Sequence, residues 1–135
     1  MMKKTLLCIL ISLYSVMAFA CTCSFPDSAK EEIGKHDLVF IGKVISKTWV
    51  DSTEEKYFLV EIELKEVFKG EIQTKIISIK TGPPLPSCGY PFKLGKTYAV
   101  YAWFTQDGTS TNQCTRNTKS WRKEKREIKT VHNTP

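Results

Sequence analysis

Cys21, Thr22 and Cys23 form the stretch whose residue types and spacing most directly support chemistry. They follow Ala18-Phe19-Ala20, the small-residue pattern at which a leader peptide is cut. Cleavage there makes Cys21 the first residue, so that one residue combines a free α-amine, a carbonyl oxygen and a sulfur that can form a disulfide. Cys23 offers a second attachment point two residues later. Held twice, this N-terminus is predicted to be a rigid projecting edge rather than a frayed end.

Residues 1–20 are predicted to be a signal peptide. Two lysines near the start are followed by an apolar run over Leu6–Val16 and by the cleavage pattern. The run is short for a membrane span and has no basic cluster after it, so we expect export to a secreted, extracellular or periplasmic location. The alternative is a bacterial lipoprotein acylated at Cys21. Its leader usually carries a branched aliphatic residue three positions before the cysteine, where this chain has Ala18.

Four cysteines remain after the leader. They are Cys21, Cys23, Cys88 and Cys114. An exported chain with four cysteines favours two disulfides. A bond between Cys21 and Cys23 is sterically awkward, which leaves two interleaved long-range pairings open. The chain has no C-x-x-C, and His36 and His132, both expected at the surface, lack a ligand-like spacing. We therefore predict no cofactor and no resident metal.

The positive charge of the chain is concentrated near its C-terminus. Without residues 1–20, 18 Lys and Arg side chains face 14 Asp and Glu, a net charge of +4. Residues 116–129 hold seven of the basic and two of the acidic side chains, so residues 21–115 have a net charge of −1. Export and this near-neutral body oppose a nucleic-acid role. The C-terminal segment is expected to be a solvated helix, with binding to an anionic glycan, lipopolysaccharide or lipid surface as the alternative.

The elements that must position these residues are mainly strands. Ser28 and Glu31 have the spacing of a capping box and predict a short helix over residues 27–35. Alternating and β-rich runs predict strands at 38–50, 58–65, 72–81 and 97–104. The first run is too long for one flat strand, and Gly42 is the natural place for a bulge.

The remaining segments are predicted to be loops and a tail. Prolines make residues 82–91 a surface loop, because they lack an N–H donor and fix φ. Residues 106–113 are expected to form a polar hairpin loop, and Cys114 to begin a last short strand. Residues 118–131 predict a basic surface helix with a thin apolar stripe.

These elements favour a mainly β fold: a small closed or partly open barrel with a short helix before it and a basic helix after it. The predicted organisation is a signal peptide at 1–20, a barrel domain at 21–116 and a basic helix or tail at 117–135. We expect a monomer.

Several short motifs occur in a consistent order between residue 21 and about residue 116. They are Cys21-Thr22-Cys23, Asp37-Leu38-Val39, Val67-Phe68-Lys69-Gly70, Cys88-Gly89-Tyr90, Gly95-Lys96 and Cys114. Together they resemble the N-terminal domain of the tissue inhibitors of metalloproteinases (TIMPs), part of the netrin-like group. The specific part is C-T-C directly after a leader together with C-G-Y. The chain is similar to short, bacterial-type members, because it lacks a second cysteine-rich domain and a third disulfide in the barrel.

The resemblance implies an OB-fold-like barrel with disulfides Cys21–Cys88 and Cys23–Cys114. It also implies that the α-amine and carbonyl oxygen of Cys21 bind the catalytic zinc of a target metalloproteinase. Thr22 is then expected to enter the pocket for the residue after the scissile bond, with Ser87 flanking the other side. The implied inhibitory edge comprises Cys21, Thr22, Cys23, Ser24, Ser87 and Cys88.

Two functions follow as hypotheses. The first is a secreted inhibitor of zinc metalloendopeptidases. The second is a non-inhibitory netrin-like binding module that recognises a protein partner or a polyanionic surface, with Cys21 and Cys23 merely attaching the N-terminal arm and Thr22 an exposed spacer. An enzyme is not expected, because no nucleophile with a base and no paired acids are recognisable. An isomerase-like role for C-x-C would require free thiols.

Overall fold

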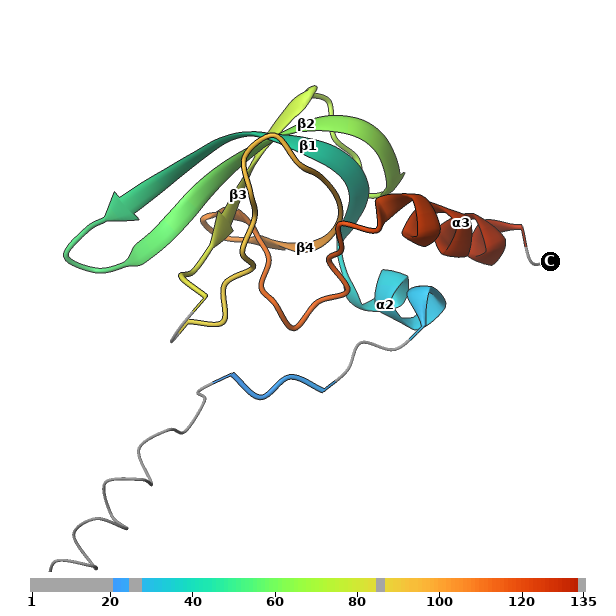
Figure 1. Cartoon of the computed structure of the whole chain (residues 1–135), viewed down its shortest axis with the longest axis horizontal. Coiled ribbons are helices and arrows are strands. Elements are labelled where there is room, and N and C mark those ends of the chain that lie inside the picture. The colour runs from blue at the N-terminus through green and yellow to red at the C-terminus, as the bar shows by residue number, and fades with distance from the viewer. Residues whose placement is uncertain (1–20, 25–27, 85–86, 134–135) are drawn as a thin grey trace, which may run out of the picture.

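The computed structural model describes residues 21–24, 28–84 and 87–133 (Figure 1); the predicted signal peptide lies outside them. The elements are α2 (Ala29–Lys35), β1 (Leu38–Asp51), β2 (Lys56–Lys69), β3 (Ile76–Thr81), β4 (Thr97–Thr105), β5 (Gly108–Ser110) and α3 (Trp121–His132). The strands close into a barrel in the order β1-β2-β3-β5-β4. This confirms the predicted fold class, a mainly β, OB-like domain with a helix before and after the strands.

β1 coils so that it can pair with two neighbours. Its 14 residues pair with β2 along nearly their whole length, and its first part, from Leu38 to Lys43, also pairs with β4. The register shifts at three places, one of them directly before Gly42, where the sequence predicts a bulge. A Cβ atom on Gly42 would lie 2.4 Å from Cγ2 of Ile62 and 2.9 Å from the carbonyl oxygen of Glu63. Glycine therefore lets β2 approach the coiled part of β1.

The core has two parts. The barrel interior is filled by aromatic and branched side chains, among them Phe40, Ile62 and Tyr98, each fully buried. On β2 the predicted alternation is present, since Val60 and Ile62 are buried whereas Glu63 and Lys65 are exposed. The smaller part lies outside the barrel, under both helices. It consists of Ala29, Val39, Tyr101 and Ile128. β4 is consequently covered on both faces, as its apolar sequence predicts.

Two predicted strands differ from the structure. β3 begins at Ile76 rather than at Ile72, which packs on the core from an irregular segment, so its apolar character reflects burial and not pairing. Within the predicted loop at 106–113, β5 forms instead. It closes the barrel through a short parallel pairing with β3 and an antiparallel pairing with β4. Cys114 lies in a turn and begins no strand, because side chains rather than a neighbouring strand satisfy its loop.

His36 is buried, so its predicted surface position is wrong. It follows α2, and its ring stacks on that of Trp103 with centroids 4.5 Å apart. Nδ1 lies 2.7 Å from the carbonyl oxygen of Glu32 and must donate to it, since a carbonyl only accepts. The side chain is buried because its ring packs on Trp103 of β4 while its Nδ1 is hydrogen-bonded to the backbone of α2. His132 is exposed as expected.

No helix in the described part of the chain has the length and apolar character required to cross a lipid bilayer.

Candidate functional site

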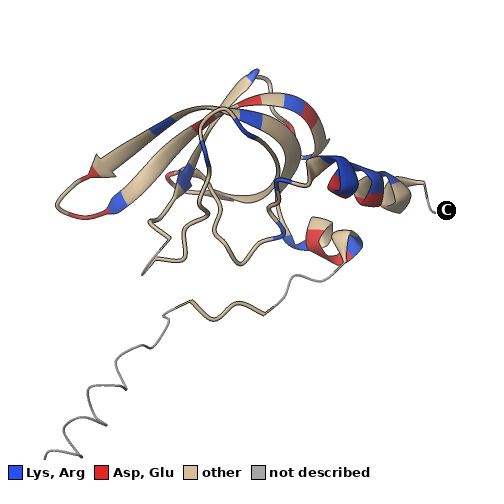
Figure 2. Ribbon diagram, in the orientation of Figure 1, with Lys and Arg blue, Asp and Glu red and all other residues tan. Residues whose placement is uncertain are grey.

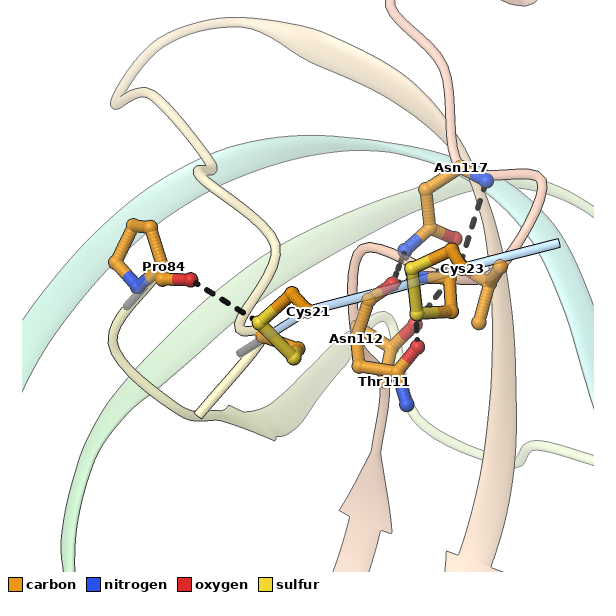
Figure 3. The surroundings of a disulfide bond; sticks show 9 residues. Cys21, Cys23, Pro84, Thr111, Asn112 and Asn117 are labelled. Atoms are coloured by element: carbon orange, nitrogen blue, oxygen red, sulfur yellow. Dashed lines mark hydrogen bonds between the residues drawn. A yellow bond between two sulfur atoms is a disulfide. The ribbon is translucent and has the colours of Figure 1, made fainter. Parts of the chain in front are cut away.

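Two disulfides attach the N-terminal segment to two different loops (Figure 3). Cys21 is bonded to Cys88 in the loop after β3, with their Cα atoms 5.5 Å apart. Cys23 is bonded to Cys114 in the loop after β5, with a Cα separation of 5.1 Å. This is the pairing that the family resemblance implies. Cys21 and Cys23 are half-buried, whereas Thr22 and Ser24 are exposed. The segment therefore directs its sulfurs towards the barrel and leaves the intervening residue in solvent.

The proline-rich loop folds back on itself to present Cys88. A Cβ atom on Gly89 would lie 1.5 Å from the carbonyl oxygen of Gly82, so no other residue fits at this contact. The backbone N–H of Gly89 donates to the carbonyl oxygen of Pro83 at 2.9 Å. Cys88 itself has a positive φ of 55°. Sγ of Cys21 lies 3.9 Å from the carbonyl oxygen of Pro84 (Figure 3), a packing contact because a disulfide sulfur has no proton to donate.

The loop that holds Cys114 is fixed by asparagine and threonine side chains (Figure 3). Oδ1 of Asn112 accepts from the backbone N–H of Cys114 at 2.9 Å. The amide of Asn117 joins the loop to β4, because its Oδ1 accepts from the N–H of Tyr101 at 2.7 Å and its Nδ2 donates to Oγ1 of Thr111 at 2.8 Å. Sequence reasoning missed these residues. The signal that could have found them is the run of Thr and Asn around Cys114, residue types that bond local backbone groups.

The two loops are also bonded to each other, since the N–H of Gln113 donates to the carbonyl oxygen of Cys88 at 2.8 Å. All six residues of the predicted inhibitory edge therefore belong to one covalently and hydrogen-bonded unit. We call it the N-terminal edge: Cys21, Thr22, Cys23, Ser24, Ser87 and Cys88. None of these side chains carries a charge, so any chemistry of the edge must come from its backbone groups and hydroxyls.

A groove of about 480 Å³ continues from Ser87 along the outside of the barrel. Its walls are the end of the β1–β2 hairpin, the end of β3 and the turn between β4 and β5. Lys80 on β3 forms an ion pair with Glu55 of the hairpin, and its Nζ lies 4.4 Å from the ring centroid of Tyr57. The hydrogen bond to Glu55 raises the pKa of Lys80 above its usual value. This pair fastens the hairpin to the strand that leads into the N-terminal edge.

The model of the family described as "Tissue inhibitor of metalloproteinase" matches residues 19–130. The chain belongs to this family. A search among curated proteins found no match to the chain. Membership gives the chain a metalloproteinase-inhibitor-like domain and makes a metalloproteinase the expected kind of partner; TIMPs are inhibitors rather than enzymes, and they are secreted proteins. The match includes α3 as well as the barrel.

In the part of the chain that the structure describes, no group of three or more His, Cys, Asp or Glu side chains could hold a metal ion.

Proposed function

We propose that the protein inhibits zinc metalloendopeptidases through its N-terminal edge, with the backbone of Cys21 binding the zinc of the protease. The observation that carries this proposal is the attachment of Cys21 and Cys23 to two separate loops, which holds the first residues in one position while Thr22 remains exposed. The family match supports the same class of target.

The chemistry requires an unblocked N-terminus at Cys21. The α-amine and carbonyl oxygen of one residue close a five-membered chelate on a metal ion. They fill the open coordination position at which the protease would otherwise activate water. Only the neutral amine has a lone pair to donate. With an α-amine pKa of about 7.7 to 8.0, neutralisation at pH 7 costs about 1 kcal/mol, which is small beside the free energy of a metal bond.

The neighbouring residues supply the contacts around the zinc. Thr22 enters the pocket that normally accepts the residue after the scissile bond, and Ser24 and Ser87 contact the protease on either side. Because the disulfides already order this edge, little conformational entropy is lost on binding. An uncharged edge also suits a cleft from which water is expelled, since no charge has to be desolvated there.

For this function we expect the protein to be exported from the cytoplasm. We also expect it to act as a monomer. Residues 1–20 act as the signal peptide, residues 21–116 carry the inhibitory edge and the barrel, and residues 117–135 form a basic segment whose helix packs on the barrel and lies largely within the family match. Two disulfides fit an oxidising compartment. Acylation of Cys21 is incompatible with the mechanism, because it would commit the amine or the sulfur to a membrane anchor.

The test compares the exported chain with a variant that has one extra alanine before Cys21. The addition converts the amine into an amide and moves the new amine away from the zinc. We expect inhibition of a panel of zinc metalloendopeptidases to weaken at least a hundredfold. Intact mass without reduction provides the control, since both chains must contain two disulfides and an unacylated Cys21. Equal inhibition by the two chains, or a native mass increased by acyl groups, contradicts the proposal.

The alternative remains a non-inhibitory netrin-like binding module that recognises a protein partner or a polyanionic surface. Absence of inhibition by a chain with a free, unmodified Cys21 would favour it. The observation that favours this alternative is the concentration of exposed Lys and Arg side chains on α3.

A further inference from the structure

α3 presents a face on which four of five residues are basic. Besides His132 at its C-terminal end, five residues of the helix point to solvent and are exposed: Arg122, Lys123, Arg126, Lys129 and Thr130. We call them the outward face of α3. The helix packs on β4 and α2 through its opposite side, where Glu124 and Ile128 are buried. The outward face therefore contains four cations and no carboxylate. In Figure 2 the ribbon of α3 is mostly blue, with red at its acidic residues.

Both carboxylates of α3 pair with Arg116, Glu124 from the buried side of the helix and Glu127 from its half-exposed flank. Oε1 of Glu124 accepts from the hydroxyl of Tyr101 and from Nε of Arg116, each at 2.6 Å. Glu127 pairs with the same guanidinium. Burial and the hydrogen bond to Glu124 raise the pKa of Tyr101 far above its usual value, so the phenol stays protonated as a donor. Glu124 thus compensates Arg116, and Glu127 is shared between Arg116 and Lys123. The other three cations of the outward face, Arg122, Arg126 and Lys129, have no carboxylate partner among the described residues of α3.

Little else offsets the outward charge. Lys123 lies 4.0 Å from Glu127, and Lys129 lies 3.5 Å from Glu66 on β2. Arg122 stacks on Trp121, with 4.4 Å between its Cζ and the ring centroid. Within the described residues, Arg126 forms no salt bridge. At least two of the four cations are therefore available to a ligand without breaking an ion pair.

The outward face lacks apolar side chains. Ile128 is fully buried against the barrel, and Trp121 and Val131 are half-buried. The large hydrophobic residues that the described chain exposes all lie outside α3. A helix that inserts into a bilayer needs an apolar face, and α3 has already used its own for packing. What remains on this face for a ligand is mainly positive charge.

We propose that the outward face of α3 binds the anionic headgroup layer of a lipid membrane by electrostatic attraction, without insertion. A convex helix with several cations on one side can place them all against a flat, densely charged layer at once. A cavity of about 310 Å³ lies at the edge of the face, where Lys123 lines it together with Asn117, Glu124 and Glu127, and the two carboxylates in its wall oppose the binding of an anionic glycan there. α3 also lies at the opposite end of the molecule from the β1–β2 hairpin (Figure 1). Adsorption through it therefore leaves the groove and the N-terminal edge uncovered.

The test measures co-sedimentation of the purified protein with vesicles of phosphatidylglycerol and phosphatidylcholine in equal parts, and with phosphatidylcholine alone. We expect binding only to the anionic vesicles, weakened strongly between 50 and 300 mM salt, conditions chosen to shorten the screening length. The variant Arg122→Gln/Arg126→Gln should bind roughly thirtyfold more weakly, as expected for two cations near such a surface. Arg122→Lys/Arg126→Lys should bind as the parent does.

The matched control is Lys75→Gln/Lys96→Gln, which removes two exposed cations outside α3. It should retain most of the binding. Every variant contains the same N-terminus, so any contribution of that end to vesicle binding is common to all. Equal loss in the control pair, equal binding to neutral vesicles, or binding to heparin oligosaccharides with none to anionic vesicles would each overturn the proposal.

Discussion

The N-terminal edge and the outward face of α3 are two exposed surfaces that differ in charge and in how their position is fixed. The edge is uncharged, and covalent bonds from two loops fix its backbone. The helix face carries four cations on flexible side chains, and its position depends on packing and on a buried carboxylate. A surface of the first kind acts through the placement of a few backbone atoms. One of the second kind acts through summed charge, which tolerates motion but is screened by salt.

The strongest test of this difference removes a disulfide. In Cys23→Ser/Cys114→Ser the bond that closes a 91-residue separation is lost without leaving a free thiol. The chain-entropy model gives a loss of about 4 to 5 kcal/mol in the free energy of unfolding, measured by urea denaturation under non-reducing conditions. Inhibition should weaken as well, because the residues after Cys21 are released. Vesicle binding, measured without urea, should be unchanged. A variant with the same urea midpoint as the parent would contradict the prediction.

The next test attacks the anchor of the helix face. Glu124→Gln keeps the shape of the side chain but removes the charge that Arg116 and the Tyr101 hydroxyl contact. Since Glu124 is buried, we expect a loss of about 2 kcal/mol in unfolding free energy, whereas inhibition should be retained. Glu127→Gln is the matched control. Its side chain is 37% exposed and shares the same guanidinium, so its loss should be below about 1 kcal/mol. Equal losses would mean that burial of Glu124 is not what matters.

These two regions also differ in how far the sequence predicts them. Local sequence patterns suffice to predict the main helices and strands. The capping box at Ser28, the alternation of β2 and the bulge before Gly42 all involve residues that are close in the chain. The position of Cys21 after a cleavage pattern predicts that the N-terminal edge begins at this residue. From the residues alone, however, two disulfide pairings stayed open, and only the family resemblance distinguished them.

Long-range contacts explain what the sequence does not predict. β5 is a three-residue polar strand that exists because β3 and β4 leave a place between them. Gly89 is required by a contact with Gly82, which local sequence patterns do not reveal. His36 is a polar residue whose burial depends on Trp103, far along the chain. The inward direction of Glu124 likewise depends on Arg116 and Tyr101. Charge counting alone therefore found the basic segment but not its one-sided distribution.

The smallest expected effect comes from Glu66→Gln. This substitution separates the two surfaces, because the free energy of unfolding should fall while vesicle binding through α3 becomes tighter. Hydrogen bonding to Lys125, with the charge of Lys129, lowers the pKa of this carboxylate. Its stabilising contribution is therefore present above the unfolded-state pKa of 4.5 and is lost as the pH falls through the lower folded-state value. Glu66→Gln should cost less than about 1 kcal/mol at pH 7. Thermal unfolding at pH 7 and pH 3 should show the difference from the parent shrinking at the lower pH.

The same substitution releases the two lysines of α3 that share Glu66. If the outward face acts by summed charge, Glu66→Gln should bind anionic vesicles a few fold more tightly while its inhibition of proteases stays the same. Lys56 pairs with Asp51 at the far end of the hairpin, so Asp51→Asn removes one carboxylate at a distance from α3 and serves as the control. Similar tightening in both variants would show that net charge, and not the local face of the helix, governs adsorption.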